Sequence, residues 1–127
     1  MFQLDYSDGK PIYEQIRDNL KQLIIEGVLK TDEKIPSVRE LAVTMAINPN
    51  TIQKAYKELE ADGYVYTIRA KGVFVAPIEK ISVGKDLEKL YKSLEEVLSE
   101  LHFLGVSKEK ITQITDKIYY ERRGSND

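Results

Sequence analysis

Apolar residues recur with helical spacing in three segments of the first half of the chain. The first segment runs from Pro11 to Gly27, and its apolar residues stand three or four positions apart up to the glycine, a typical helix end. The second begins at Ser37, whose side chain can cap a helix while Glu40 returns a hydrogen bond to the cap. The third begins at Asn48, a good cap that is followed by Pro49 at the first helical position. The pattern therefore predicts three helices.

The third helix has one apolar face and one polar face. The residues that would pack on a core are Ile52, Ala55, Tyr56 and Leu59. The residues on the opposite face are Asn50, Gln53, Lys54 and Lys57. Because amides pair with base edges and lysines with phosphates, this polar face has the residue types of a helix that reads DNA.

Two β-rich segments follow the third helix, which we expect to end before Gly63. They cover Tyr64 to Ile68 and Val73 to Val75, and the turn between them contains Arg69 and Lys71. These features predict a β-hairpin with a cationic tip. A helix with a polar first turn, followed by such a hairpin, is typical of a winged helix-turn-helix, in which the helix enters a groove and the wing contacts the DNA backbone.

After Pro77 the apolar spacing alternates between three and four residues, which indicates a helix that packs along a seam with another helix. The seam positions are Val83, Leu87, Leu90, Leu94, Val97, Leu101 and Leu104. A helix from Val83 to Leu104 would be roughly 33 Å long at ~1.5 Å per residue. Gly105 would end it, and Ser107 would cap a second helix. The apolar face of that second helix consists of Ile111, Ile114 and Ile118.

This predicted helical hairpin has more apolar surface than two helices can bury. Packing against the winged domain would cover it within one chain, but we favour a homodimer, because a two-fold partner completes a helix bundle. The expected fold is therefore mainly α with a small β-hairpin wing. Residues 1–77 would form the winged helix-turn-helix and residues 78–127 a two-helix dimerisation hairpin.

From Lys10 to Pro77 the chain resembles the DNA-binding domain of GntR-type bacterial transcription regulators. The matching segments are Pro11–Ile16, Ile35–Ala42, Asn48–Tyr56 and Lys71–Val75. The Asn-Pro-Asn-Thr sequence from Asn48, the short lead-in at Phe2 to Asp5 and the brief C-terminal region are similar to the YtrA subfamily. The chain departs from the family pattern in three places that often hold glycine, which are Asp32, Ala46 and Ala70.

The resemblance implies a homodimeric repressor of its own operon, often one that encodes an ABC-type transporter, bound to an inverted-repeat operator. The candidate DNA contacts are Arg39, Asn48, Asn50, Thr51, Gln53, Lys54, Lys57, Arg69 and Lys71. Arg39 resembles the family's arginine that reaches DNA, whereas Asn48 serves first as a helix cap. An effector, if one exists, would bind at the dimer interface or between the hairpin and the winged domain.

Composition limits the other classes of function. The chain has 127 residues, a net charge of −2 and no cysteine. Because affinity for DNA comes largely from cations that neutralise phosphates, a local basic patch has to supply it. The missing thiols fit a reducing compartment, so together with the lack of a signal peptide or membrane span we expect a cytoplasmic protein.

Catalysis has little support in the sequence. The only histidine, His102, cannot form a metal site by itself, nor can it supply both a catalytic base and the group that orients that base. We therefore expect no enzyme activity, metal or cofactor. Two alternatives to a sequence-specific regulator stay open: a winged-helix module that binds another protein, and an architectural protein that binds any DNA duplex.

Overall fold

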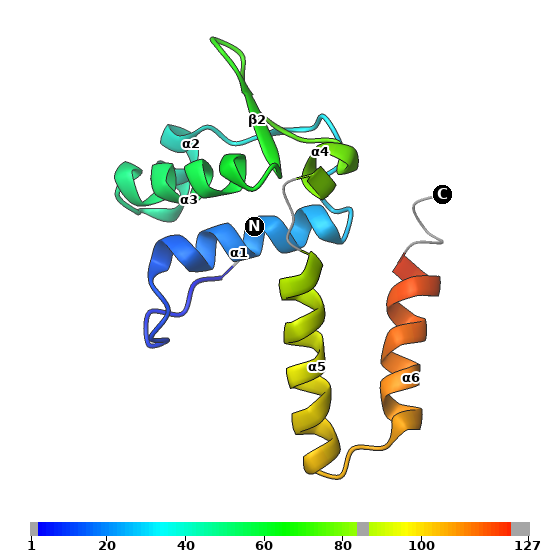
Figure 1. The fold of residues 1–127 in the computed structure, drawn as a ribbon. Coiled ribbons are helices and arrows are strands. Elements are labelled where there is room, and N and C mark those ends of the chain that lie inside the picture. The colour runs from blue at the N-terminus through cyan, green and yellow to red at the C-terminus, as the bar shows by residue number, and fades with distance from the viewer. Residues whose placement is uncertain (1–2, 84–86, 123–127) are drawn as a thin grey trace. The chain divides into compact units, whose positions relative to one another are not determined.

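The computed structural model describes residues 3–83 and 87–122 (Figure 1). The chain forms two compact units, Met1–Lys85 and Asp86–Asp127. The elements of the first unit are α1 (Ile12–Ile25), β1 (Lys34–Ile35), α2 (Val38–Met45), α3 (Pro49–Ala61), β2 (Val65–Ile68), β3 (Gly72–Val75) and α4 (Ile78–Val83). The elements of the second unit are α5 (Leu87–Phe103), α6 (Lys108–Asp116) and the π-helical turn η1 (Lys117–Arg122).

The helix starts in the first unit follow from the capping residues. Ser37 accepts a hydrogen bond from the Glu40 N–H at 3.0 Å, and the Glu40 carboxylate accepts one from the Ser37 N–H, which completes the predicted capping box of α2. The Asn48 side chain accepts from the Asn50 N–H at 2.8 Å, and Pro49 is the first residue of α3. Both predicted helix starts are confirmed.

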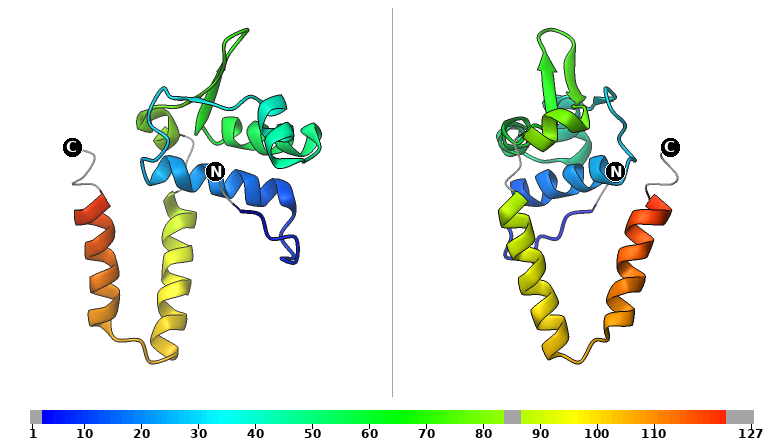
Figure 2. Two further views of the ribbon diagram at one scale, coloured as in Figure 1. Left: turned by 180° about the vertical axis from the view of Figure 1, so that it is seen from behind. Right: turned by 45° about the vertical axis from the view of Figure 1, so that its right-hand side comes forward.

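The core of the first unit is built around the contact between α1 and α3. Ile16 and Leu20 of α1 and Ile52 and Leu59 of α3 are fully buried. At about 1.5 to 3 kcal/mol per buried aliphatic side chain, this contact makes a large contribution to the stability of the unit. Helix α3 lies between α1 and the wing hairpin (Figures 1 and 2), so the core fixes the direction in which α3 presents its other face.

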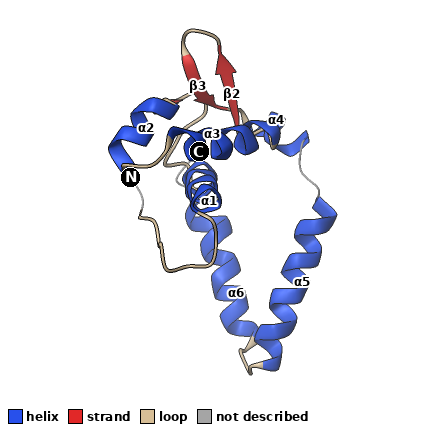
Figure 3. Ribbon diagram, turned by 90° about the vertical axis from the view of Figure 1, so that its left-hand side faces the viewer, coloured by secondary structure: helices blue, strands red, loops and turns tan. Residues whose placement is uncertain are grey.

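The wing belongs to a three-stranded antiparallel sheet with the strand order β1-β3-β2. Strands β2 and β3 pair from Val65 with Val75 to Ile68 with Gly72, as the hairpin prediction requires (Figure 3). The two-residue strand β1 pairs with the other edge of β3, with Lys34 opposite Phe74. The sequence pattern did not predict β1, because two residues are too few to show an alternating period.

Three residues adopt the left-handed backbone conformation that usually favours glycine. Asp32, Ala46 and Ala70 have φ angles of 66°, 55° and 70°. These are the three positions where the chain departs from the glycines of the family pattern. The chain therefore keeps the backbone of the glycine-containing turns, at a cost of about 1 to 2 kcal/mol for each residue with a Cβ atom.

Helix α4, which follows the wing, was not predicted. The predicted helix from Val83 to Leu104 is wrong at its start: Val83 is the last residue of α4, and α5 begins at Leu87. Ile81 of α4 packs against the core, which keeps α4 with the winged unit and extends that unit beyond the predicted boundary at Pro77. The predicted lead-in begins at Phe2, which lies outside the described residues.

The second unit contains the two helices that the seam pattern and the capping residue predicted. Helix α5 ends at Phe103, Gly105 has a φ angle of 86°, and the Ser107 side chain accepts a hydrogen bond from the Lys110 N–H at the start of α6. The two helices run in opposite directions from this turn (Figure 2). Neither α5 nor α6 contains a buried residue.

Candidate nucleic-acid interface

Tyr56 fixes the two helices of the helix-turn-helix to each other. It is 4% exposed, and its hydroxyl donates a hydrogen bond to the Pro36 carbonyl oxygen at 2.6 Å, just before α2 begins. Burial raises the pKa of Tyr56, and the negative charge of Glu40 raises it further. The prediction that Tyr56 belongs to the core face of α3 is confirmed, and the side chain has no free face with which to stack on a base.

The polar face of α3 is accessible, as the sequence pattern indicated. Its exposed candidates are Asn48, Asn50, Gln53, Lys54 and Lys57, whereas Thr51 is half-buried. The Oδ1 atom of Asn48 is occupied by the helix cap, so only its amide hydrogens face outward as donors. Arg39 is exposed on the first turn of α2. One helix-turn-helix therefore carries the five candidates of α3, its cap Asn48, and Arg39.

The wing presents two further cations. Arg69 and Lys71 are exposed in the turn between β2 and β3, and the Lys71 N–H closes this turn by donating to the Ile68 carbonyl at 2.9 Å. The hairpin extends beyond the helices of the first unit (Figure 3). Such a tip can contact phosphates beside a groove that a helix occupies.

Aromatic contacts that sequence reasoning missed stiffen the wing. The rings of Tyr66 and Phe74 stack with their centroids 5.6 Å apart across the two strands. The Tyr66 hydroxyl donates to the Asp32 carboxylate at 2.7 Å, which ties the wing to the turn before β1. Alternation along the strands would have placed Tyr66 and Phe74 on one face, but only the register of the hairpin makes them neighbours.

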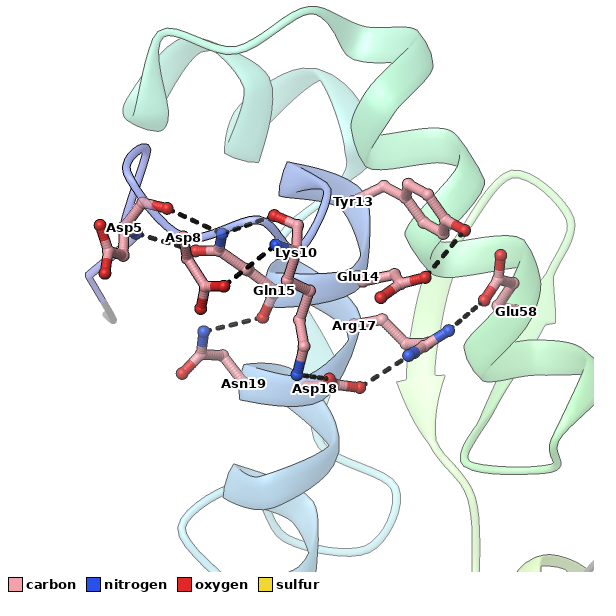
Figure 4. A network of polar contacts seen from close by, with 10 residues as sticks. All are labelled: Asp5, Asp8, Lys10, Tyr13, Glu14, Gln15, Arg17, Asp18, Asn19 and Glu58. Atoms are coloured by element: carbon pink, nitrogen blue, oxygen red, sulfur yellow. Dashed lines mark hydrogen bonds and ion pairs between the residues drawn. The ribbon is translucent and has the colours of Figure 1, made fainter.

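Ion pairs neutralise one acidic residue of α1, Asp18, and one of α3, Glu58 (Figure 4). Arg17 donates hydrogen bonds to Glu58 of α3 and to Asp18, and Lys10 donates to Asp18 at 3.1 Å. Partial burial opposes the charge of Arg17, but its bonds to Glu58 and Asp18 outweigh burial and raise its pKa. Partial burial likewise opposes the charge of Asp18, but the bonds from Lys10 and Arg17 lower its pKa. These carboxylates therefore add little repulsion toward phosphate.

Gln15 holds the segment before α1 in place. Its side-chain carbonyl accepts from the Asp5 N–H at 2.8 Å, and its amide donates to the carbonyls of Asp5 and Lys10. All of its polar atoms thus have partners although the residue is only 7% exposed. The described residues of this segment form no strand, and they are held against α1 by these hydrogen bonds.

The described residues contain no helix that is both long enough and apolar enough to span a membrane. Within the same residues, no three His, Asp or Glu side chains are grouped so that they could hold a metal ion. The candidate interface consists of hydrogen-bonding and cationic side chains on α2, on α3 and its cap, and on the wing.

Comparison with known proteins gives one consistent result. Residues 12–75 match the family described as bacterial regulatory proteins, gntR family. The chain is 37% identical over 126 residues to the HTH-type transcriptional repressor YtrA of Bacillus subtilis (strain 168). The matched residues cover 98% of this chain and 96% of the relative. These relatives are transcription regulators and not enzymes.

Two solved structures share the fold. A transcriptional antiterminator from Listeria monocytogenes EGD-e has a TM-score of 0.73 and 36% identity, with 92% of this chain and 88% of that chain covered. AraR(DBD) in complex with operator ORE1 has a TM-score of 0.52 and 32% identity, with 60% of this chain and 95% of that chain covered. The second structure is a DNA-binding domain in complex with an operator.

Proposed function

Because the chain belongs to the GntR family of bacterial regulatory proteins, we propose that it is a homodimeric repressor that binds an inverted-repeat operator through α3 and the wing. The observation that carries this proposal is the exposed amide-rich and cationic face of α3 beside a cationic wing tip. The relative named as a repressor and the related domain in complex with an operator support it.

Each candidate residue has a role that follows from its chemistry. Asn50 and Gln53 are suited to adenine, and Arg39 can bind guanine with two hydrogen bonds. The half-buried Thr51 can contact phosphate or a thymine methyl group. The remaining candidates suit phosphate or the minor groove, with Asn48 as a donor, and they are Asn48, Lys54, Lys57, Arg69 and Lys71. Together these contacts would give a specific complex that weakens as salt rises.

The apolar face of the second unit supports the dimer. Exposed fractions of 44 to 67% occur at Leu87, Leu90, Leu94, Val97, Leu104, Ile114 and Ile118. Leu101 and Ile111 are half-buried. Apolar surface of this extent marks an interaction site, and a second copy of the chain would complete a bundle from the two hairpins. A two-fold dimer would then offer two α3 helices to two half-sites roughly one helical turn apart.

One finer proposal rests on the resemblance to the YtrA subfamily, and a second concerns an effector. The operator would lie in the promoter of the chain's own operon, and that operon would encode an ABC-type transporter. A small-molecule effector would act by changing the spacing of the two recognition helices, which is a rigid-body switch.

The function is tested by salt-titrated binding to the DNA upstream of the chain's own gene and to a scrambled duplex of equal length. We expect binding to the promoter that is at least ~1,000-fold tighter than to the scrambled duplex, the lower end for specific regulators. Equal affinity for both duplexes would instead indicate an architectural protein. Absence of binding to either would favour a module that binds another protein.

Within the same assay, Gln53→Ala tests whether α3 reads bases. Loss of a good base contact costs about 1 to 3 kcal/mol, so promoter affinity should fall about 5- to 150-fold while affinity for the scrambled duplex stays unchanged. Gln22→Ala is the matched control, because Gln22 is an exposed glutamine on α1. Equal effects of the two substitutions would contradict base reading by Gln53.

A further inference from the structure

Two successive contacts join one side of α1 to one side of α3, and Figure 4 shows the second of them, between Arg17 and Glu58. Tyr13 and Arg17 are one turn apart on α1, and Lys54 and Glu58 are one turn apart on α3. The Lys54 Nζ atom lies 3.9 Å from the centroid of the Tyr13 ring, which is a close cation–π contact. One turn further along both helices, the Arg17 guanidinium binds the Glu58 carboxylate.

The pairing of Glu58 with Arg17 determines whether Lys54 has a carboxylate partner. Residues four apart on a helix are neighbours, so Lys54 and Glu58 would ordinarily attract each other. Arg17 binds Glu58 instead, and among the side chains that the structure describes no carboxylate lies within ion-pair distance of Lys54. Among the described side chains the ammonium group therefore has no carboxylate partner, while Glu58, one turn beyond it, is paired with Arg17 of α1.

Tyr13 positions the ammonium group of Lys54. An aromatic ring attracts a cation through its quadrupole and carries no net charge, so Tyr13 holds the ammonium without neutralising it. The ring is itself oriented, because its hydroxyl donates to Glu14 at 3.3 Å. Lys54 remains exposed, one turn after Asn50 on the same face of α3. A lysine that is already held in place loses less rotamer freedom when it binds an anion.

We propose that Tyr13 and Arg17 are positioning residues of the DNA interface, which hold Lys54 in place and without a carboxylate partner, so that it can bind a backbone phosphate. The inference rests on the proposed function, because it specifies how one contact of that interface is prepared. Tyr13 acts by contact with Lys54, and Arg17 acts by removing Glu58 as a competitor for Lys54 and as a charge that repels phosphate. Helix α1 thus serves DNA binding in addition to its part in the core.

The Arg17 part of the proposal is tested by a double-mutant cycle on the full-length protein. Promoter affinity is measured against salt for wild type, Arg17→Gln, Glu58→Gln and the double variant. We expect Arg17→Gln to weaken binding about three- to tenfold and to lower the slope of log K against log salt by about one, as for one lost phosphate contact. Glu58→Gln should bind as tightly as wild type or more tightly, and adding it to Arg17→Gln should restore affinity to within about twofold.

A purely structural role for the ion pair gives the opposite pattern. The pair is absent in both single variants and in the double variant, so all three would then bind equally weakly. That result, or an Arg17→Gln variant that binds like wild type, would overturn the proposal. Rescue in the double variant would also show that Arg17→Gln had not simply unfolded the domain.

The Tyr13 part is tested by comparing Tyr13→Phe with Tyr13→Leu. Phenylalanine keeps the ring face that contacts Lys54 and loses only the hydroxyl bond to Glu14, so affinity and salt slope should remain close to those of wild type, whereas leucine should reduce both. In a Lys54→Gln background, Tyr13→Leu should have no further effect on binding. An equal loss in that background would overturn the link to Lys54. If wild type itself fails to bind the promoter, the proposed function fails, whereas binding by wild type without these differences refutes only the positioning role.

Discussion

Substitution of Leu94 with aspartate is expected to convert the dimer into monomers and to lower operator affinity by about 100-fold or more. Leu94 is 53% exposed in the single chain and stands in the middle of the apolar stripe of α5. In the proposed bundle it would be enclosed by the partner, where an unpaired carboxylate is strongly destabilising. Two linked DNA-binding domains gain about 10²- to 10⁴-fold over one domain, and this gain would be lost.

The measurement for Leu94→Asp combines sedimentation equilibrium with promoter binding. Ser99→Asp is the matched control, because it adds the same charge at an exposed polar position of α5. The control should remain a dimer with wild-type affinity. Since α5 contains no buried residue, neither substitution should unfold the chain. A Leu94→Asp variant that stays dimeric, or that binds the promoter like the control, would contradict the proposed interface.

The second large effect is expected for Gly63→Ala, which should lower the free energy of unfolding by about 2 to 5 kcal/mol. Gly63 ends α3 with a φ angle of 83°, and a Cβ atom there would lie 2.9 Å from the Lys80 carbonyl oxygen of α4. The left-handed conformation costs about 1 to 2 kcal/mol for a residue with a side chain. Overpacking against backbone typically adds about 1 to 3 kcal/mol.

Urea unfolding followed by circular dichroism measures this loss, with all samples at one protein concentration because a dimer's stability depends on concentration. Gly9→Ala is the control, since no atom lies within 4 Å of a Cβ at that position. Its effect should be within ~0.5 kcal/mol of zero. A loss of only about 1 to 2 kcal/mol for Gly63→Ala, the cost of the left-handed conformation alone, would show that α4 does not pack against Gly63.

Helices α1, α2 and α3 of the winged unit could be predicted because their signals are local. The capping box of Ser37 and Glu40, the cap at Asn48 and the break at Gly63 each act within a few residues of sequence. The core face of α3 followed from the 3.6-residue period alone. A hairpin with a basic tip was likewise visible, because two short β-rich runs flank a turn.

The features that were missed depend on contacts between distant residues. Strand β1 exists because Lys34 and Ile35 pair with β3, about forty positions further along the chain. Helix α4 was missed because it depends on the packing of Ile81 on the core of the winged unit. The seam pattern placed Val83 in the C-terminal helix, because apolar spacing alone does not show to which of two successive helices a residue belongs.

The candidate site shows the same division. Its residue types and their place on α3 were predicted from the sequence, and the structure exposes nearly all of them. The contact of Tyr13 with Lys54 and the pairing of Arg17 with Glu58 could not be predicted, because they cross between helices roughly forty residues apart. A chain with a net charge of −2 can thus form a DNA interface, because its acidic residues are partly paired away from it.

The central claim is that a two-fold dimer reads two half-sites with its two α3 helices. The most direct test takes the promoter site found by footprinting and inserts five or ten base pairs between its half-sites. Five base pairs turn one half-site by about half a helical turn, to the opposite face of the duplex, whereas ten base pairs restore the face at a greater distance. The account predicts that the five-pair insertion reduces wild-type affinity to that of a single half-site. Unchanged affinity after this insertion would contradict the account.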